Sequence, residues 1–152
     1  MSGAPPTPLT EEEAARLLGG QRFGILASVK RDGHPHLSTV LYRWSEADRT
    51  IRVSSTADRL KVRQLRRDPR TALHVSGPTI WSYAVAEGEA EVSEPSAEPG
   101  DAVGRELLAM TPGFTDHAAE QEFLDQLVAD RRVVIRIRVA RLYGAALTIA
   151  TS

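Results

Sequence analysis

Residues 23–44 read FGILASVKRDGHPHLSTVLYRW, two apolar, β-branched runs separated by a turn. The turn falls at residues 31–34, because Asp-Gly tolerates the positive φ angles that hairpin turns require. The segments on either side, 23–30 and 36–44, are therefore predicted to be paired antiparallel strands. This hairpin sets the fold class, since it begins an antiparallel sheet and not a parallel one.

Outside the hairpin, apolar and β-branched runs bounded by turn residues occur again. Four further segments have the composition of strands: 49–54, 70–76, 81–92 and 132–143. In the segment 81–92, small residues at Ala86, Gly88 and Ala90 share one face, which predicts a bend or a close backbone approach. An antiparallel sheet with few helices usually closes into a barrel to remove its edges. We therefore predict a mainly β fold with flanking helices, built on six antiparallel strands.

The helix boundaries carry capping signals. Thr10 and Glu13 form a capping-box pattern, which predicts a short helix directly after residue 10. A second, strongly basic helix is expected over 59–67, with Thr56 or Asp58 as its N-cap.

Length and composition limit the organisation. At 152 residues the chain has the length of one domain. Residues 1–9 include three prolines and are predicted to be a disordered tail, which leaves 10–152 as a single domain.

Composition changes before the last strand. Residues 101–110 and 116–130 are predicted helices, and together they form a helical insertion at about 95–130. The second helix carries an apolar stripe made of Phe123, Leu124, Leu127 and Val128. Charge is also partitioned: residues 87–130 have 1 basic and 12 acidic side chains, whereas the chain as a whole has a net charge of −1.

Several classes of protein are excluded or disfavoured. The absence of cysteine excludes disulfides, thiolate metal sites and a nucleophilic cysteine. No apolar run approaches the ~18 residues of a membrane span, and the first residues lack the pattern of a signal peptide. We expect a cytoplasmic protein without a membrane partner. His34 and His36 have no nearby carboxylate at a ligand's spacing, so no metal site is predicted.

The stretch from the third strand into the basic helix points to an anion. Arg59 and Lys61 fall in the first helical turn, where the helix dipole disfavours cations. A phosphate held by these two side chains and a Ser or Thr hydroxyl would resolve the conflict, and Arg63 is a candidate for a second anionic contact. The alternative is that both cations point into solvent. Nucleic acid is a poor partner, because no aromatic residue is interleaved with the basic ones.

Three stretches carry a family resemblance: GILASVKRDGHPHLSTV at 24–40, RLKVRQLRRDPR at 59–70 and WSYAVAEG at 81–88. Together they resemble the pyridoxamine 5′-phosphate oxidase-like (FMN-binding split barrel) superfamily, and within it the actinobacterial branch dependent on the deazaflavin coenzyme F-420. The resemblance runs from about residue 10 to 143. It implies a six-stranded split β-barrel that forms a homodimer, with the cofactor in a groove at the dimer interface.

By matching position, the resemblance also implies cofactor-binding residues and leaves the catalytic residue unknown. Those near the phosphate are Arg59, Lys61, Ser54 and Gln64; those facing the ring are Ser38 and Thr39; those reaching the neighbouring subunit's site are Trp81, Ser82 and Tyr83. Arg136 and Arg138 match no motif of the family and are interpreted as strand residues.

The implied function is an oxidoreductase that transfers hydride from reduced F-420 to an unsaturated or conjugated small molecule. F-420 and FMN are both tricyclic cofactors with a phosphate, and F-420 is the more anionic. The Arg-rich body, with 17 Arg among 19 basic residues, suits F-420 for this reason. Two alternatives stay open: an FMN-dependent enzyme like pyridoxamine-phosphate oxidase, and a non-catalytic flavin-, deazaflavin- or haem-binding protein.

Overall fold

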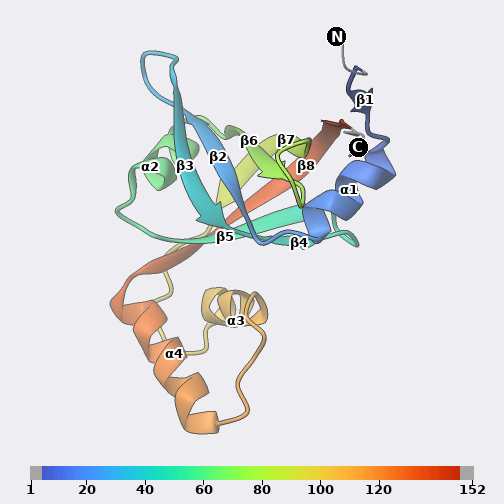
Figure 1. The fold of residues 1–152 in the computed structure, drawn as a ribbon. Helices are drawn as coiled ribbons and strands as arrows, with labels where there is room; N and C mark the ends of the chain where they lie inside the picture. The colour runs from blue at the N-terminus through green and yellow to red at the C-terminus, as the bar shows by residue number, and fades with distance from the viewer. Residues whose placement is uncertain (1–4, 148–152) are drawn as a thin grey trace.

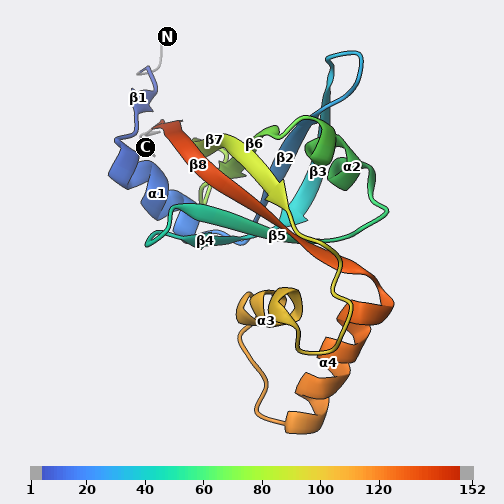
Figure 2. The ribbon, with the colours of Figure 1, turned by 180° about the vertical axis from the view of Figure 1, so that it is seen from behind.

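A curled antiparallel sheet with helices at its margins makes up the computed structural model, which describes residues 5–147 (Figure 1). The mainly β, antiparallel split-barrel class predicted from the sequence is confirmed. The strands run in the spatial order β3-β2-β6-β7-β8-β5-β4, and the short β1 pairs with β8. Because β3 and β4 end the row without pairing to each other, the barrel stays open along one side (Figure 2).

The strands closely follow the predicted segments. Their bounds are β1 Thr7–Pro8, β2 Phe23–Val29, β3 Pro35–Leu41, β4 Arg43–Ser45, β5 Thr50–Thr56, β6 Arg70–Ser76, β7 Ser82–Val92 and β8 Arg132–Ala146. The β7–β8 register shifts between Glu87 and Gly88, which pair with Arg141 and Val139, so the extra residue of this bulge is Ala140 in β8. A Cβ on Gly88 would lie 2.0 Å from the carbonyl oxygen of Arg138, which confirms the close approach predicted there.

The described residues form eight strands instead of the predicted six, for two reasons. The predicted strand 36–44 is divided at Tyr42, whose N–H bonds to the Arg22 carbonyl and whose hydroxyl donates to the Leu18 carbonyl at 2.5 Å. In addition, Thr7–Pro8 pairs with the end of β8, so this part of the predicted tail 1–9 is ordered. Residues 1–4 of that tail lie outside the described residues.

Four helices accompany the sheet: α1 Glu11–Gly19, α2 Leu60–Arg67, α3 Ala102–Ala109 and α4 His117–Ala129. The predicted capping box at Thr10 and Glu13 is present at the start of α1. The predicted cap of α2 is wrong. Arg59 occupies the N-cap position without a side-chain hydrogen bond, because the Thr56 hydroxyl donates to the Asp58 carboxylate instead. Each helix between residues 5 and 147 is too short or too polar to cross a membrane.

Two apolar clusters hold these elements together. The larger fills the barrel and includes Leu26, Ile51, Leu73, Ile135 and Ile137, all nearly inaccessible to solvent. The smaller packs α3 and α4 against the first residues of β8 through Leu107, Leu124, Leu127 and Val134. The insertion formed by α3 and α4 thus lies below the open barrel as a separate layer (Figure 1).

Candidate functional site

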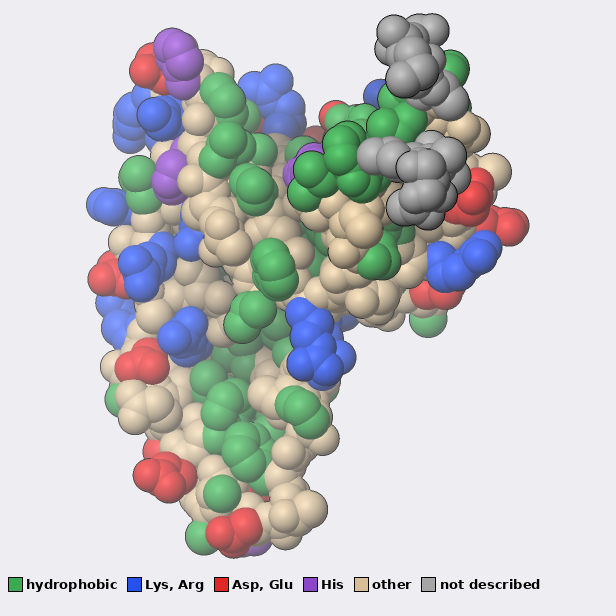
Figure 3. All heavy atoms as spheres, in the orientation of Figure 1, with side chains coloured by type: hydrophobic (Ala, Val, Ile, Leu, Met, Phe, Trp, Pro, Cys, Tyr) green, Lys and Arg blue, Asp and Glu red, His purple; other side chains and the backbone are tan. Residues whose placement is uncertain are grey.

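An open cleft of about 1160 Å³ lies between the barrel and the insertion. Figure 3 shows hydrophobic side chains gathered in this region, with Lys and Arg side chains on either side of it. Residues from α2, β3, β5, α3 and α4 contribute to its walls. The volume is slightly above the usual range for ligand sites, which is roughly 300–1,000 Å³, as expected for a cleft that is open to solvent.

The start of α2 supplies the positive end of the cleft. β5 ends at Thr56, and Arg59 and Lys61 follow within five residues, so both cations reach the cleft wall beside Ser54. The first turn of α2 holds no acidic residue. Its free backbone N–H groups and the helix dipole therefore add positive potential to that of the side chains.

Neither cation forms an ion pair with another described residue. Among residues 5–147, no carboxylate oxygen lies within 4.0 Å of Arg59 or Lys61. Burial and the neighbouring Arg59 charge both lower the pKa of Lys61. Two adjacent cations, one half-buried, are stabilised by an anion between them, as a phosphate group would be.

β3 forms the opposite rim of the cleft. Thr39, Val40 and Leu41 line it, and β3 is an end strand of the sheet. An end strand has backbone N–H and C=O groups without ladder partners on its outer side. These groups can bond to the heteroatoms of a polar ring system lying along the strand.

The insertion supplies an apolar wall that the site prediction did not include. Leu107 and Met110 contribute from the end of α3, and Phe123 and Leu127 from one face of α4. The apolar stripe on residues 116–130 was the available signal, but a stripe of this kind is as consistent with core packing as with a ligand site. Together with the cations, these side chains make a cleft that is polar at one end and apolar along its floor.

Four of the predicted cofactor-binding residues line the cleft, whereas Gln64 and Ser38 point elsewhere. Arg59, Lys61, Ser54 and Thr39 all line it. Gln64 instead is 3% exposed, and its Oε1 accepts bonds from Ser28 Oγ at 2.6 Å and His36 Nδ1 at 2.8 Å. Ser38 points away from Thr39, because successive side chains of a strand face opposite sides.

The remaining predicted residues lie elsewhere on the surface. Trp81, Ser82 and Tyr83 do not line the cleft of their own chain. Trp81 is 46% exposed, and the Tyr83 ring stacks on His74 with centroids 5.3 Å apart. Arg63 is exposed on α2, one turn beyond Arg59 and outside the cleft lining.

Comparison with known proteins identifies a family and several structures with the same fold. A family model described as pyridoxamine 5′-phosphate oxidase matches residues 10–145. A conserved hypothetical protein from Mycobacterium tuberculosis is similar in structure, with 26% identity and a TM-score of 0.68 over 95% of this chain and 94% of that one.

Two further solved structures share the fold. One is an FAD-binding protein from Mesorhizobium loti, with 24% identity and a TM-score of 0.67, covering 97% of this chain and all of the other. The second is described as an F-420 reductase, with 24% identity and a TM-score of 0.59, covering 84% of this chain and 93% of the other.

Proposed function

Because this chain belongs to the pyridoxamine 5′-phosphate oxidase family, we propose that it is an oxidoreductase that binds coenzyme F-420 in the cleft. Reduced F-420 would supply hydride to an unsaturated or conjugated small molecule. The observation that carries the proposal is the pair Arg59 and Lys61, two cations on the cleft wall with no carboxylate within 4.0 Å in the described chain.

The cleft fits the two parts of such a cofactor. Arg59, Lys61 and the hydroxyl of Ser54 would hold the phosphate. The outer edge of β3 and the apolar side chains of the insertion would hold the ring between them. Each hydrogen bond to a charged group contributes about 1.5–3 kcal/mol, and micromolar binding needs about 8.2 kcal/mol. Phosphate contacts alone are therefore marginal, and ring burial has to provide the rest.

The protein's own part in the reaction is to bind, orient and exclude water. Among the described residues that line the cleft, Asp130 is a carboxylic acid, and Arg132 lies 3.9 Å from it. The Tyr42 hydroxyl also borders the cleft but donates to the Leu18 carbonyl, and burial raises its pKa well above the usual range. We expect the proton to come from solvent.

F-420 and FMN differ in the lactyl-oligoglutamate tail that follows the F-420 phosphate. Further along α2, Arg66 Nη2 donates to the Ser93 carbonyl and Arg67 Nη2 to the Val29 carbonyl, each at 2.8 Å. Arg63 has no such hydrogen bond among residues 5–147, and it is exposed. Arg63 is therefore the cation of α2 that we expect to contact a tail carboxylate.

Titration with F-420 and with FMN, followed by tryptophan fluorescence, tests the proposal. Micromolar or tighter F-420 binding with weaker FMN binding supports it, and Arg63→Ala should then weaken F-420 binding without changing FMN binding. The reverse preference would make the protein an FMN-dependent enzyme. Tight F-420 binding without turnover of enones, quinones or tetrapyrroles would make it a carrier.

We also propose that the protein is a homodimer. The outer face of the β2–β3 hairpin exposes Phe23, Ile25, Leu37 and Leu41, of which Phe23 is 62% and Leu41 73% exposed. Phe23 and Leu41 are opposite each other in the ladder, so the exposed apolar surface is continuous. A second subunit on this face would bury it and would let Trp81, Ser82 and Tyr83 approach the partner's cleft.

Light scattering tests the dimer. The wild-type protein should have twice the mass of one chain, and Phe23→Glu should produce monomers, because it places a charge in the apolar face. Phe114→Glu is a suitable control, since Phe114 is 39% exposed and lies in the helical insertion, away from the hairpin and from Trp81. A wild-type monomer at working concentration would remove Trp81, Ser82 and Tyr83 from the site.

A further inference from the structure

We infer that Glu106 on α3 is a positioning residue for the ring-binding half of the cleft, an inference that rests on the proposed function. Glu106 does not line the cleft of about 1160 Å³. Its immediate neighbour Leu107 does, and so does Met110, one turn further along the helix. The carboxylate acts by fixing α3 to the barrel, and α3 then presents these two side chains to the ring.

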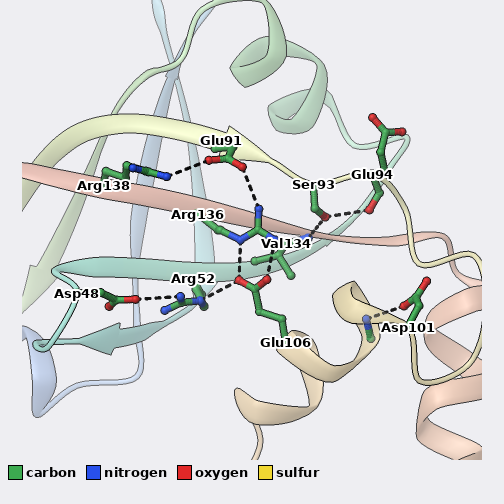
Figure 4. Close-up of polar contacts among 11 residues, drawn as sticks. Asp48, Arg52, Glu91, Ser93, Glu94, Asp101, Glu106, Val134, Arg136 and Arg138 are labelled. Carbon is green, nitrogen blue, oxygen red and sulfur yellow. Dashed lines mark hydrogen bonds and ion pairs between the residues drawn. The ribbon is translucent and has the colours of Figure 1, made fainter.

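Two barrel strands contribute arginines to this carboxylate (Figure 4). Arg136 on β8 donates from Nε at 2.7 Å and from Nη2 at 2.6 Å, a bidentate pair. Arg52 on β5 donates from Nε at 2.9 Å. All three side chains are about a quarter exposed or less, so solvent screens the pairs only in part.

A third strand holds the end of the same helix. Arg43 on β4 donates from Nε to the Met110 carbonyl at 2.7 Å. Met110 is the C-cap of α3, where a cation also matches the helix dipole. We call Arg43, Arg52, Arg136 and Glu106 the α3 clamp, since they join three neighbouring strands to one short helix.

Apolar packing does not fix α3 on this side. An open cavity of about 430 Å³ lies between the helix and strands β4 and β5. Arg43, Arg52 and Glu106 of the clamp line it together with Trp44, Ser45, Ala109 and Met110. Leu107 packs instead toward α4 and β8. Because a cavity leaves room for the helix to move, the polar contacts of the clamp decide where α3 comes to rest.

This arrangement predicts that losing the clamp weakens ring binding and leaves phosphate binding intact. Phosphate binding depends on Arg59 and Lys61, which belong to α2 and lie across the cleft from α3. FMN and riboflavin separate the two effects, because they carry the same ring and only FMN carries the phosphate.

The experiment compares Glu106→Gln, Lys61→Ala and Glu91→Gln with wild type in titrations with both ligands. Glu106→Gln should weaken FMN and riboflavin by the same factor, about tenfold, whereas Lys61→Ala should weaken FMN alone. Glu91→Gln is the matched control, since Glu91 pairs with Arg136 and Arg138 but lies on β7, and it should bind both ligands normally. If Arg52→Met also folds, it should weaken FMN and riboflavin binding equally, by a smaller factor than Glu106→Gln does.

A second measurement needs no ligand. In a Trp81→Phe background, Trp44 is the remaining tryptophan and borders the cavity beside α3. Glu106→Gln should shift its emission to longer wavelength as α3 moves, and Glu91→Gln should not. Wild-type riboflavin affinity in Glu106→Gln, or loss of FMN affinity alone, would overturn the inference. If the wild-type protein binds F-420 but neither of these ligands, the same comparison is made with F-420 and its phosphate-free deazaflavin fragment; a wild-type protein that binds none of the four ligands would instead overturn the proposed function itself.

Discussion

The start of α2 and the α3 clamp are both rich in cations, and they differ in what surrounds those cations. In the clamp, Arg52 and Arg136 share the Glu106 carboxylate through three short hydrogen bonds. At α2, Arg59 and Lys61 have no carboxylate within 4.0 Å in the described chain. The first group is satisfied within the protein, and the second is not.

From this difference we expect pairing, and not residue type, to separate structural from ligand-binding cations in this molecule. A paired arginine has already lost its hydration in exchange for protein contacts, so it has little to gain from a ligand. An unpaired and half-buried lysine is stabilised when an anion arrives. The predictions below test this contrast, in order of decreasing effect.

The largest effect is expected at Arg59 and Lys61, the two cations at the start of α2. The double variant Arg59→Ala, Lys61→Ala should lose about 3–6 kcal/mol of cofactor binding, since two charge-assisted hydrogen bonds disappear. The melting temperature should not fall, because removing cations from a helix start relieves an unfavourable dipole interaction of about 0.3–1 kcal/mol. Calorimetric titration and thermal melts measure the two quantities. Full-strength binding by the double variant would place the phosphate elsewhere.

In the α3 clamp we expect a substitution to lower the stability of the protein more than its cofactor binding, the reverse of the effect at α2. Glu106→Gln removes the carboxylate that two partly buried arginines share and leaves them only the more exposed Asp48 and Glu91 as partners, so we expect a loss of about 1–3 kcal/mol in the free energy of unfolding. Denaturant unfolding measures it. Glu91→Gln should change stability by less than about 0.5 kcal/mol, because Glu91 is largely exposed. Equal losses in the two variants would contradict the special role of Glu106.

Acid should remove the clamp's contribution. Hydrogen bonds from Arg136 and then Arg52 hold the pKa of Glu106 below its ordinary value of 4.5, against the opposing effect of burial. A carboxyl whose pKa is lowered by folding stabilises fully above its unfolded pKa and loses that contribution as the pH falls through its folded pKa. The stability difference between wild type and Glu106→Gln should be constant above about pH 5.5 and shrink below about pH 4.5.

The smallest effect is that of salt. Raising the ionic strength from about 0.1 M to about 1 M shortens the Debye length from about 10 Å to about 3 Å. FMN affinity should fall severalfold, while riboflavin affinity, which involves no phosphate, should stay the same or rise. An equal response of both ligands to salt would show that Arg59 and Lys61 do not contact the phosphate.

The fold could be predicted because its signals are local. The Asp-Gly turn at 32–33, the alternation in 132–143 and the capping box at Thr10 each act over a few residues, and each is found in the structure. The break at Tyr42 could not be predicted. It depends on a hydrogen bond to the Leu18 carbonyl, which lies 24 residues away in the chain.

The site could be predicted only in part, because much of it depends on contacts between residues that are distant in the sequence. The cluster of Arg59 and Lys61 is visible in the sequence, and both residues line the cleft. Gln64 lies on the same helix, but helix geometry turns it toward Ser28 and His36 and away from the cleft. Which arginines are paired depends on tertiary contacts such as that between Arg136 and Glu106, 30 residues apart, so sequence spacing gives no sign of it.

The pairing of β1 with the end of β8 has a practical consequence. Thr7 lies opposite Ala146, so the two ends of the described chain share one edge of the barrel, on the far side from α3 and α4 (Figure 1). Anchoring a single chain to a sensor surface through this edge would leave its own insertion facing the solution, with the surface beside Trp81, whose carbonyl accepts from the Leu147 N–H. Cofactor and substrate exchange could then be followed on immobilised protein.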